Sequence, residues 1–159
     1  LKIFIDEARA KGAHPILVTP TSRRRFDENG KSVNTHGDYP DAVRWVAAKE
    51  NVPLIELNGM TAILFNALGV DNSTKAFVHY PAGTFPGQTR TLKDNTHFST
   101  YGAYEVSKCV IEGMKKADLE IVKYLRPDYS GFDPAQPDSF ESFKWNLGSF
   151  TENEKPDGN

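Results

Sequence analysis

The 159-residue sequence has only one cysteine, Cys109, which excludes an internal disulfide and leaves the redox compartment open. It also lacks any apolar run close to the roughly 18–20 residues of a transmembrane helix, so it predicts no membrane partner. Acidic and basic residues nearly balance, with a formal net charge of −2, which gives no reason to expect nucleic acid as a partner. No histidines or carboxylates show metal-ligand spacing, and we expect neither a catalytic metal nor a cofactor.

What remains is an ordinary globular composition in which short apolar runs alternate with helical patterns. Helical spacing of apolar residues is found over residues 1–11, 39–50, 59–68 and 99–116. Unbroken apolar runs, typical of buried parallel strands, are found at 16–18 and 53–57. This alternation predicts an α/β fold, with a parallel sheet between two layers of helices. Residues 77–79 are at best a short strand, and 81–93 are expected to form a long loop.

The composition changes after Arg126, where prolines punctuate a segment rich in aspartate, serine and glycine. We therefore place one domain in residues 1–126 and an irregular tail in residues 127–159. The aromatic residues of the tail predict that it packs on the domain, and those considered are Phe132, Phe140, Phe143, Trp145 and Phe150. Its last residues are expected to be disordered or a linker. Stacking of Trp145 on a sugar ring is an alternative use of one of these aromatics.

The most informative stretch is residues 94–104, which read DNTHFSTYGAY. Asp94 lies three residues before His97, so its carboxylate can accept a hydrogen bond from His97 Nδ1–H. That bond leaves Nε2 available to take a proton from a nucleophile. Ser99 or Thr100 can cap the helix that follows. By spacing alone, a surface cap or salt link remains an alternative to catalysis.

The flanking residues carry a family resemblance. Residues 94–112, DNTHFSTYGAYEVSKCVIE, resemble the last conserved block of the SGNH (GDSL-type) hydrolases, and are most similar to the rhamnogalacturonan acetylesterase-like branch. Residues 15–26, PILVTPTSRRRF, resemble the strand and arginine-bearing loop of the same branch. The resemblance covers roughly residues 1–125. It implies a flavodoxin-like three-layer sheet and a serine esterase in which Asp94 and His97 are catalytic.

One departure from the family pattern concerns the nucleophile. The family carries its serine in a Gly-Asp-Ser block on the first strand, and its oxyanion hole draws on two further upstream blocks. Neither Gly-Asp-Ser nor Gly-x-Asn-Asp occurs in these 159 residues, and Gly37-Asp38-Tyr39 has tyrosine at the nucleophile position. We therefore expect a C-terminal portion of an esterase, with the N-terminal strands and the serine outside this chain, and little or no turnover by the chain alone.

The run of arginines at 23–25 has two interpretations. In one, a solvated loop pairs its guanidinium groups with the nearby carboxylates of Asp27, Glu28 or Asp38. In the other, Arg23 and Arg24 bind the substrate, because guanidinium groups grip carboxylates in a bidentate way and a pectin backbone carries galacturonate. The run lies after a predicted strand, so we expect it at the same sheet edge as His97.

The resemblance implies that the function is removal of O-acetyl groups from rhamnogalacturonan or a related polysaccharide, in a secreted or periplasmic enzyme. The expected partners are an acetylated acidic polysaccharide or oligosaccharide and the missing N-terminal half of the same enzyme. A second copy that covers the exposed sheet edge is a further candidate partner. Two alternatives stay open: a non-catalytic carbohydrate-binding or interaction fragment, and an SGNH esterase or lipase acting on small or lipid esters.

Overall fold

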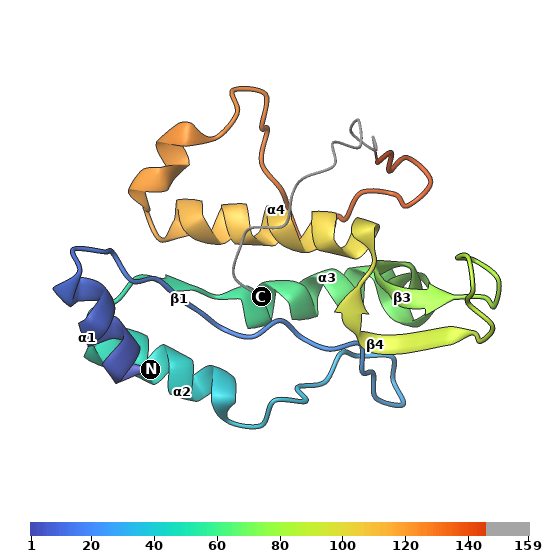
Figure 1. Ribbon diagram of the computed structural model, residues 1–159, viewed down its shortest axis with the longest axis horizontal. Coiled ribbons are helices and arrows are strands. Elements are labelled where there is room, and N and C mark those ends of the chain that lie inside the picture. The colour runs from blue at the N-terminus through green and yellow to red at the C-terminus, as the bar shows by residue number, and fades with distance from the viewer. Residues whose placement is uncertain (146–159) are drawn as a thin grey trace.

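A computed structural model of the chain describes residues 1–145. The elements, in order, are α1 (Lys2–Ala10), β1 (Leu17–Val18), α2 (Tyr39–Lys49), β2 (Leu54–Ile55), α3 (Leu57–Asn72), the 3₁₀ helix η1 (Ser73–Ala76), β3 (Phe77–Tyr80), β4 (Leu92–Phe98), α4 (Thr100–Lys116) and the 3₁₀ helix η2 (Glu120–Tyr124) (Figure 1). No helix within residues 1–145 combines the length and apolar character needed to cross a membrane.

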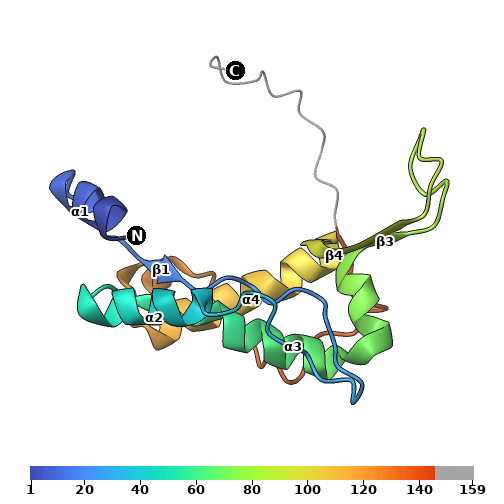
Figure 2. The same ribbon diagram turned by 90° about the horizontal axis from the view of Figure 1, so that it is seen from below.

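Strands β1 and β2 form the predicted parallel pair, with Leu17 opposite Leu54 and Val18 opposite Ile55. The pair lies between α4 on one side and α1 with α2 on the other (Figures 1 and 2). The mixed α/β class is thus confirmed, with helices on both sides of a small parallel pair. The complete three-layer sheet stays a prediction, because the described residues contain two parallel strands.

The second sheet corrects the sequence analysis. The predicted long loop over residues 81–93 ends early, because β4 begins at Leu92. It pairs antiparallel with β3, with Phe77 opposite Phe98 and Tyr80 opposite Leu92. The hairpin closes because the carbonyl of Pro81 accepts hydrogen bonds from Thr84 Oγ1 at 2.7 Å and Gln88 Nε2 at 2.9 Å. Residues 92–98 are mostly polar, so hydrophobic periodicity did not predict this strand.

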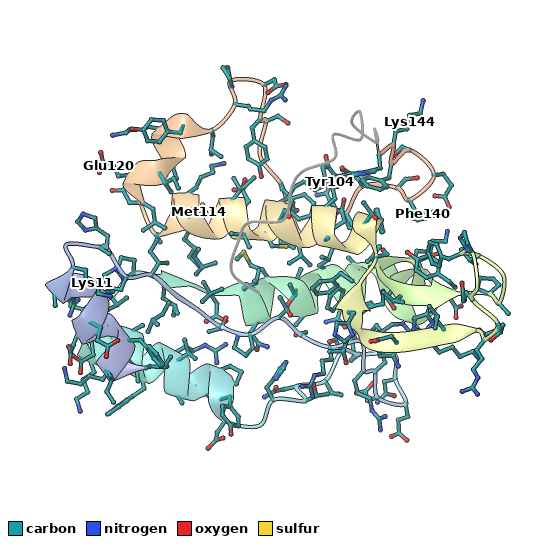
Figure 3. The ribbon with its side chains drawn as sticks, in the orientation of Figure 1. Lys11, Tyr104, Met114, Glu120, Phe140 and Lys144 are labelled. Atoms are coloured by element: carbon teal, nitrogen blue, oxygen red, sulfur yellow. The ribbon has the colours of Figure 1, made fainter. Side chains whose placement is uncertain are left out.

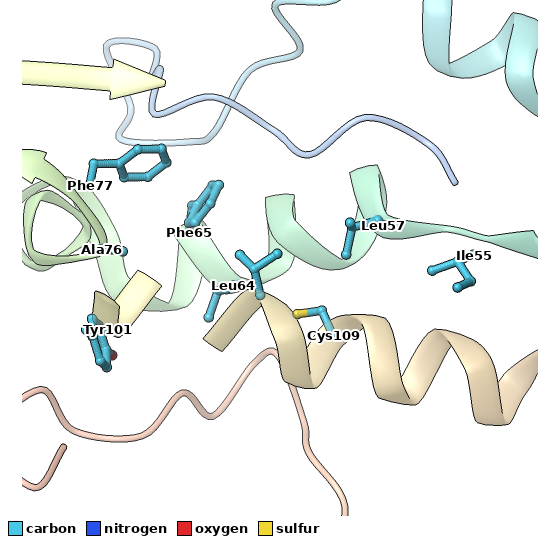
Figure 4. Close-up of a cluster of buried hydrophobic side chains, with 9 residues drawn as sticks. Ile55, Leu57, Leu64, Phe65, Ala76, Phe77, Tyr101 and Cys109 are labelled. Atoms are coloured by element: carbon cyan, nitrogen blue, oxygen red, sulfur yellow. The ribbon is translucent and has the colours of Figure 1, made fainter. Parts of the chain in front are cut away.

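The core joins α3, α4 and the β3–β4 hairpin (Figure 4). The ring of Phe77 lies 5.0 Å from that of Phe65 and 5.1 Å from that of Phe98, centroid to centroid. Cys109 is fully buried in the same core, and burial raises the pKa of its thiol to about 12. Cys109 is therefore a core residue.

The apolar face predicted for the first helix is only partly used within the described residues. Ile5 is buried, but the side chains of Leu1 and Phe4 are 52% and 73% exposed. The helical spacing of these residues was predicted correctly.

The tail described by the structure runs back along α4 (Figure 1). Glu112 Oε1 accepts hydrogen bonds from the Tyr129 hydroxyl at 2.9 Å and from the Phe132 amide at 3.1 Å. The ring of Phe140 packs edge-on against Tyr101, on the side of α4 that also carries Tyr104 (Figure 3). Trp145 is 60% exposed, so its sugar-stacking role stays a prediction. Phe150 and the expected disordered end at residues 152–159 lie outside the described residues.

Candidate active site

Residues 94–97 form a bulge in β4. On one side of the bulge Phe77 pairs with Phe98, and on the other side His79 pairs with Lys93. Between these two pairs, β3 contributes one residue and β4 contributes four. Bulges of this kind re-aim side chains at the edge of a sheet. Here the bulge carries both members of the predicted acid–base pair.

Asp94 and His97 make the hydrogen bond predicted from their spacing. Asp94 Oδ2 lies 2.6 Å from His97 Nδ1, while Oδ1 accepts the backbone N–H of His97 at 2.9 Å and of Thr96 at 2.7 Å. The amide and imidazole of His97, followed by the amide of Thr96, lower the pKa of Asp94 to about 2. Asp94 is therefore an ionised acceptor that orients the imidazole ring.

The other edge of the His97 ring faces outward. The side chain of His97 is 78% exposed, and no residue in 1–145 makes a hydrogen bond to Nε2. Because a carboxylate can only accept, the bond to Asp94 assigns the ring proton to Nδ1. Nε2 is then the basic nitrogen, in a position to accept a proton from a group that approaches from outside the described residues.

Ser99, the nearest serine in sequence, is a helix cap. Its hydroxyl accepts the amide of Gly102 at 3.1 Å and donates to the carbonyl of Lys75 at 2.6 Å. The predicted capping of α4 by Ser99 is confirmed. Because its hydroxyl donates to one backbone group and accepts from another, Ser99 is a poor candidate for the nucleophile.

The arginine loop meets the bulge, as expected from its place after β1. The backbone N–H of Arg24 donates to the carbonyl of Asn95 at 2.9 Å, and its guanidinium donates to Asn95 Oδ1 at 3.2 Å. Arg23 is exposed and makes no side-chain hydrogen bond to residues 1–145. The expected ion pairs of this run with Asp27, Glu28 and Asp38 are not among the pairs that residues 1–145 form, so that interpretation of Arg24 is wrong.

A second polar cluster, which the sequence analysis missed, lies where β1 and β2 end. Arg44 donates to both carboxylate oxygens of Glu56 at 2.7 Å, and Thr19 Oγ1 donates to Glu56 Oε1 at 3.1 Å. The hydrogen bonds from Arg44 lower the pKa of Glu56 against the effect of burial. This cluster anchors the start of the arginine loop. A glutamate directly before a helix, where it can cap, was the signal available.

Within residues 1–145, no group of three or more histidine, cysteine, aspartate or glutamate side chains is placed to hold a metal ion. A hollow of about 610 Å³ lies at the opposite ends of β1 and β2, lined in part by Pro15, Ile16 and Pro53. Neither Asp94 nor His97 lines it, so the hollow is not part of the candidate site.

Known proteins similar to this chain include two from Bacillus subtilis (strain 168). The chain is 44% identical over 125 residues to the protein named rhamnogalacturonan acetylesterase RhgT, covering 79% of this chain and 54% of RhgT. It is 36% identical over 125 residues to the protein named "Probable rhamnogalacturonan acetylesterase YesY", covering 79% of this chain and 53% of YesY. The chain thus spans about half the length of these relatives. No protein-family model matches the chain.

The structure resembles a crystal structure of the Bacillus subtilis protein YXIM, with a TM-score of 0.60 and 22% sequence identity. The match covers 75% of this chain and 30% of that protein. At this identity the similarity supports the fold alone.

Proposed function

We propose, from the homology of this chain to rhamnogalacturonan acetylesterases over about half of their length, that it is part of a carboxyl-ester hydrolase. Its substrate would be the O-acetyl groups of rhamnogalacturonan or a related polysaccharide. The observation that carries this proposal is the Asp94–His97 pair, with 2.6 Å between Oδ2 and Nδ1 and an outward-facing ring. A surface salt link alone would not account for the pair lying in a segment homologous to esterases.

The proposed mechanism uses Asp94 and His97 as the acid–base half of a Ser-His-Asp triad. A serine hydroxyl attacks the acetyl carbonyl while His97 Nε2 takes its proton. The proton then passes to the departing sugar hydroxyl, and water releases acetate from the acyl-serine by the same steps. Asp94 holds the ring and stabilises its charged form.

We place the serine in a segment outside this chain. Neither a hydroxyl nor a thiol of residues 1–145 makes a hydrogen bond to His97, and the one thiol, Cys109, is buried in the core. The chain also spans only about half the length of RhgT and YesY. These observations support a nucleophile supplied by the rest of a longer enzyme, together with its oxyanion-hole donors.

We propose Arg23 as a contact for the acidic backbone of the polysaccharide. It is exposed on the loop whose next residue, Arg24, bonds to the bulge. A guanidinium group at this place can pair with a galacturonate carboxylate in a bidentate way. An enzyme with a polymeric substrate must meet it outside the cytoplasm, so a secreted or periplasmic location belongs to the same proposal.

The proposal is tested with a chimaera in which the 125 aligned residues of RhgT are replaced by those of this chain. We expect it to release acetate from acetylated rhamnogalacturonan. His97→Ala should lower kcat by at least about 10⁴-fold, and Asp94→Asn by about 10⁴-fold, because the triad acts as a unit. Circular dichroism of each variant checks that the fold is retained. Acetate release that survives His97→Ala would contradict the proposal.

The same chimaera separates the alternatives. Hydrolysis of a phospholipid or of small esters in preference to acetylated rhamnogalacturonan would favour a lipase or general esterase. Saturable binding of oligogalacturonide that is unaffected by His97→Ala, without any turnover, would favour a binding module. The chain by itself should cleave p-nitrophenyl acetate little or not at all. Rapid cleavage that persists in Ser99→Ala but is lost in His97→Ala would reveal a nucleophile within this chain.

A further inference from the structure

We propose that Arg24 is a positioning residue, which holds the bulge of Asp94 and His97 in place through Asn95. As a statement about catalysis, this rests on the proposed function of Asp94 and His97. As a statement about structure, it stands on hydrogen bonds that tie three distant segments of the chain together. It differs from the sequence prediction, in which Arg24 binds the substrate.

Arg24 grips Asn95 by both its backbone and its side chain. The amide of Arg24 donates to the Asn95 carbonyl at 2.9 Å, and Nη1 donates to Asn95 Oδ1 at 3.2 Å. Asn95 directly follows Asp94 in the bulge. The position of Asn95 therefore sets where the Asp94 carboxylate lies. It also sets the positions of the Thr96 and His97 amides, which donate hydrogen bonds to that carboxylate.

The rest of the guanidinium is anchored to the end of α3. Nη2 donates to the carbonyl of Val70 at 2.5 Å, and Nε donates to the buried hydroxyl of Ser73 at 3.0 Å. The Val70 carbonyl lies beside a break in the helix, because Gly69 adopts φ 72° and ψ 179°. All three nitrogens of the Arg24 side chain thus donate within the chain, which leaves little of the fork for a substrate carboxylate.

His79 completes the anchor from strand β3. Its Nε2 lies 2.8 Å from Asn95 Oδ1, the same oxygen that Arg24 approaches. An arginine can only donate, so it fixes the Asn95 amide with its oxygen toward both partners. His79 must then donate from Nε2, which assigns its proton to that nitrogen. Histidine on the strand and arginine on the loop hold one amide between them.

These contacts matter because the bulge has little other support. The side chains of Asp94 and His97 are 37% and 78% exposed, and Asn95 and Thr96 are also exposed. An exposed segment with few packed apolar contacts opens easily unless hydrogen bonds hold it. The anchor through Arg24 is the link between the bulge and the buried Ser73. Its loss should loosen the Asp94–His97 geometry without unfolding the core.

The test on this chain is the ionisation of the Asp94 carboxyl, followed by NMR of its carboxyl carbon. With a pKa of about 2, Asp94 in the wild-type chain should be about nine-tenths ionised at pH 3. In Arg24→Ala the amides of Thr96 and His97 lose their fixed place, so the pKa should rise toward the ordinary 3.8 and the group should be mostly protonated at pH 3. Solvent exchange of the His97 amide should rise with it.

Three further variants make the test decisive. Arg24→Lys should behave like Arg24→Ala, since an ammonium group cannot reach Asn95, Val70 and Ser73 at once. Asn95→Ala removes Oδ1, the side-chain acceptor that Arg24 and His79 share, and keeps the other contacts of Arg24. It therefore decides the question even if Arg24→Ala does not fold. Arg25→Ala removes the same charge from a neighbouring exposed side chain and should leave Asp94 unchanged. A folded Asn95→Ala chain whose Asp94 still titrates near pH 2 would overturn the proposal.

Kinetics of the RhgT chimaera distinguish positioning from substrate binding. A positioning role predicts that Arg24→Ala lowers kcat by about 10²-fold with little change in KM, as small misplacements of catalytic groups do. A substrate-binding role predicts a raised KM at unchanged kcat, which would contradict us. If the chimaera itself releases no acetate, the proposed function fails, while the NMR result still decides whether Arg24 holds the bulge.

Discussion

Gly102 is the residue on which the close packing of α4 against η1 depends most directly. A Cβ atom at this position would lie 1.9 Å from the carbonyl oxygen of Ala76 and 2.7 Å from its carbon. Both are backbone atoms, and the same oxygen accepts the amide of Ser99 at 3.1 Å, so neither can move away cheaply. The glycine in the stretch of residues 94–104 therefore has a steric role in bringing the first turn of α4 against η1.

We expect Gly102→Ala to lower the free energy of unfolding by about 2–3 kcal/mol, because overpacking against backbone forces the helix to shift. Urea denaturation measures the change. Gly59→Ala is the matched control, since its Cβ would lie 3.7 Å from a glutamate side chain within a helix. That substitution should raise the free energy of unfolding by about 0.4–1 kcal/mol. Equal stability of the Gly102→Ala and wild-type chains would show that the contact with Ala76 yields more readily than we infer.

Single residues were predictable when their partners were near in sequence. The Asp94–His97 hydrogen bond and the Ser99 cap each span three residues, so spacing was enough to predict them. Arg24 was a different case, because Ser73 and Asn95 lie 49 and 71 residues away. The charge of Arg24 and its position on a loop suggested that it binds an acidic substrate. Its guanidinium instead donates to neutral acceptors of the chain, which only the tertiary fold brings close to it.

At the scale of elements, the break at the end of α3 has the clearest consequence. Gly69 interrupts the helix with a positive φ of 72°, although a Cβ there would meet no atom within 4 Å. A side chain at Gly69 would therefore destabilise the chain through the backbone conformation it must adopt, and not through a clash. The break also affects the candidate site, because it adjoins the Val70 carbonyl that accepts a hydrogen bond from Arg24.

Gly69→Ala should accordingly lower the free energy of unfolding by about 1–3 kcal/mol, which is the usual cost of a strained backbone conformation. It should also raise the solvent exchange of the His97 amide in the still-folded chain, since the acceptor of Arg24 shifts. Urea denaturation and NMR exchange measure the two effects. If the stability changed but the exchange of the His97 amide did not, the break at Gly69 would have no influence on the bulge.

Elements with an apolar stripe were predicted well, and those without one were not. The helix predicted over residues 39–50 is observed as Tyr39–Lys49, and the one predicted over residues 59–68 lies within α3, before the break at Gly69. Strand β4 was missed because its pairing depends on the backbone of β3 and on a polar turn. The bulge in it was not foreseeable either. A four-residue excursion in a strand leaves no periodic signal in the sequence.

At the scale of the whole molecule, a buried charge cluster fastens the tail to α4. Lys108 Nζ lies 2.9 Å from Glu105 Oε1 and 2.7 Å from Asp138 Oδ2, and the Tyr101 hydroxyl donates to the Asp138 carbonyl at 2.6 Å. Glu105 is fully buried, and burial raises its pKa, an effect that Lys108 opposes. The aromatic composition of the tail hinted at packing, but its acidic partner for Lys108 was not predictable.

Lys108→Met should lower the free energy of unfolding by about 3–5 kcal/mol near neutral pH, because it leaves the Glu105 carboxylate buried without its partner. The pKa of Glu105 is higher in the folded than in the unfolded chain, so the folded state keeps a proton that the unfolded state releases. The stability of Lys108→Met should therefore fall as pH rises from about 4.5 through the folded pKa. Urea midpoints at pH 5 and pH 8 measure the slope.

The double variant Glu105→Gln with Lys108→Met removes both charges and should lose that pH dependence. It should also recover part of the stability at pH 8. A slope that persists in the double variant would show that Glu105 is not its source. If Lys108→Met were as stable as the wild-type chain at pH 8, the tail would not depend on this cluster.

The bulge of β4 begins and ends at paired residues, His79 with Lys93 and Phe77 with Phe98. The register of the strands on either side is therefore set by pairing with β3, outside residues 94–97. The hairpin thus fixes only the two ends of residues 94–97. The path between those ends depends on the residues themselves, because Asn95 Oδ1 is the atom that Arg24 and His79 both approach.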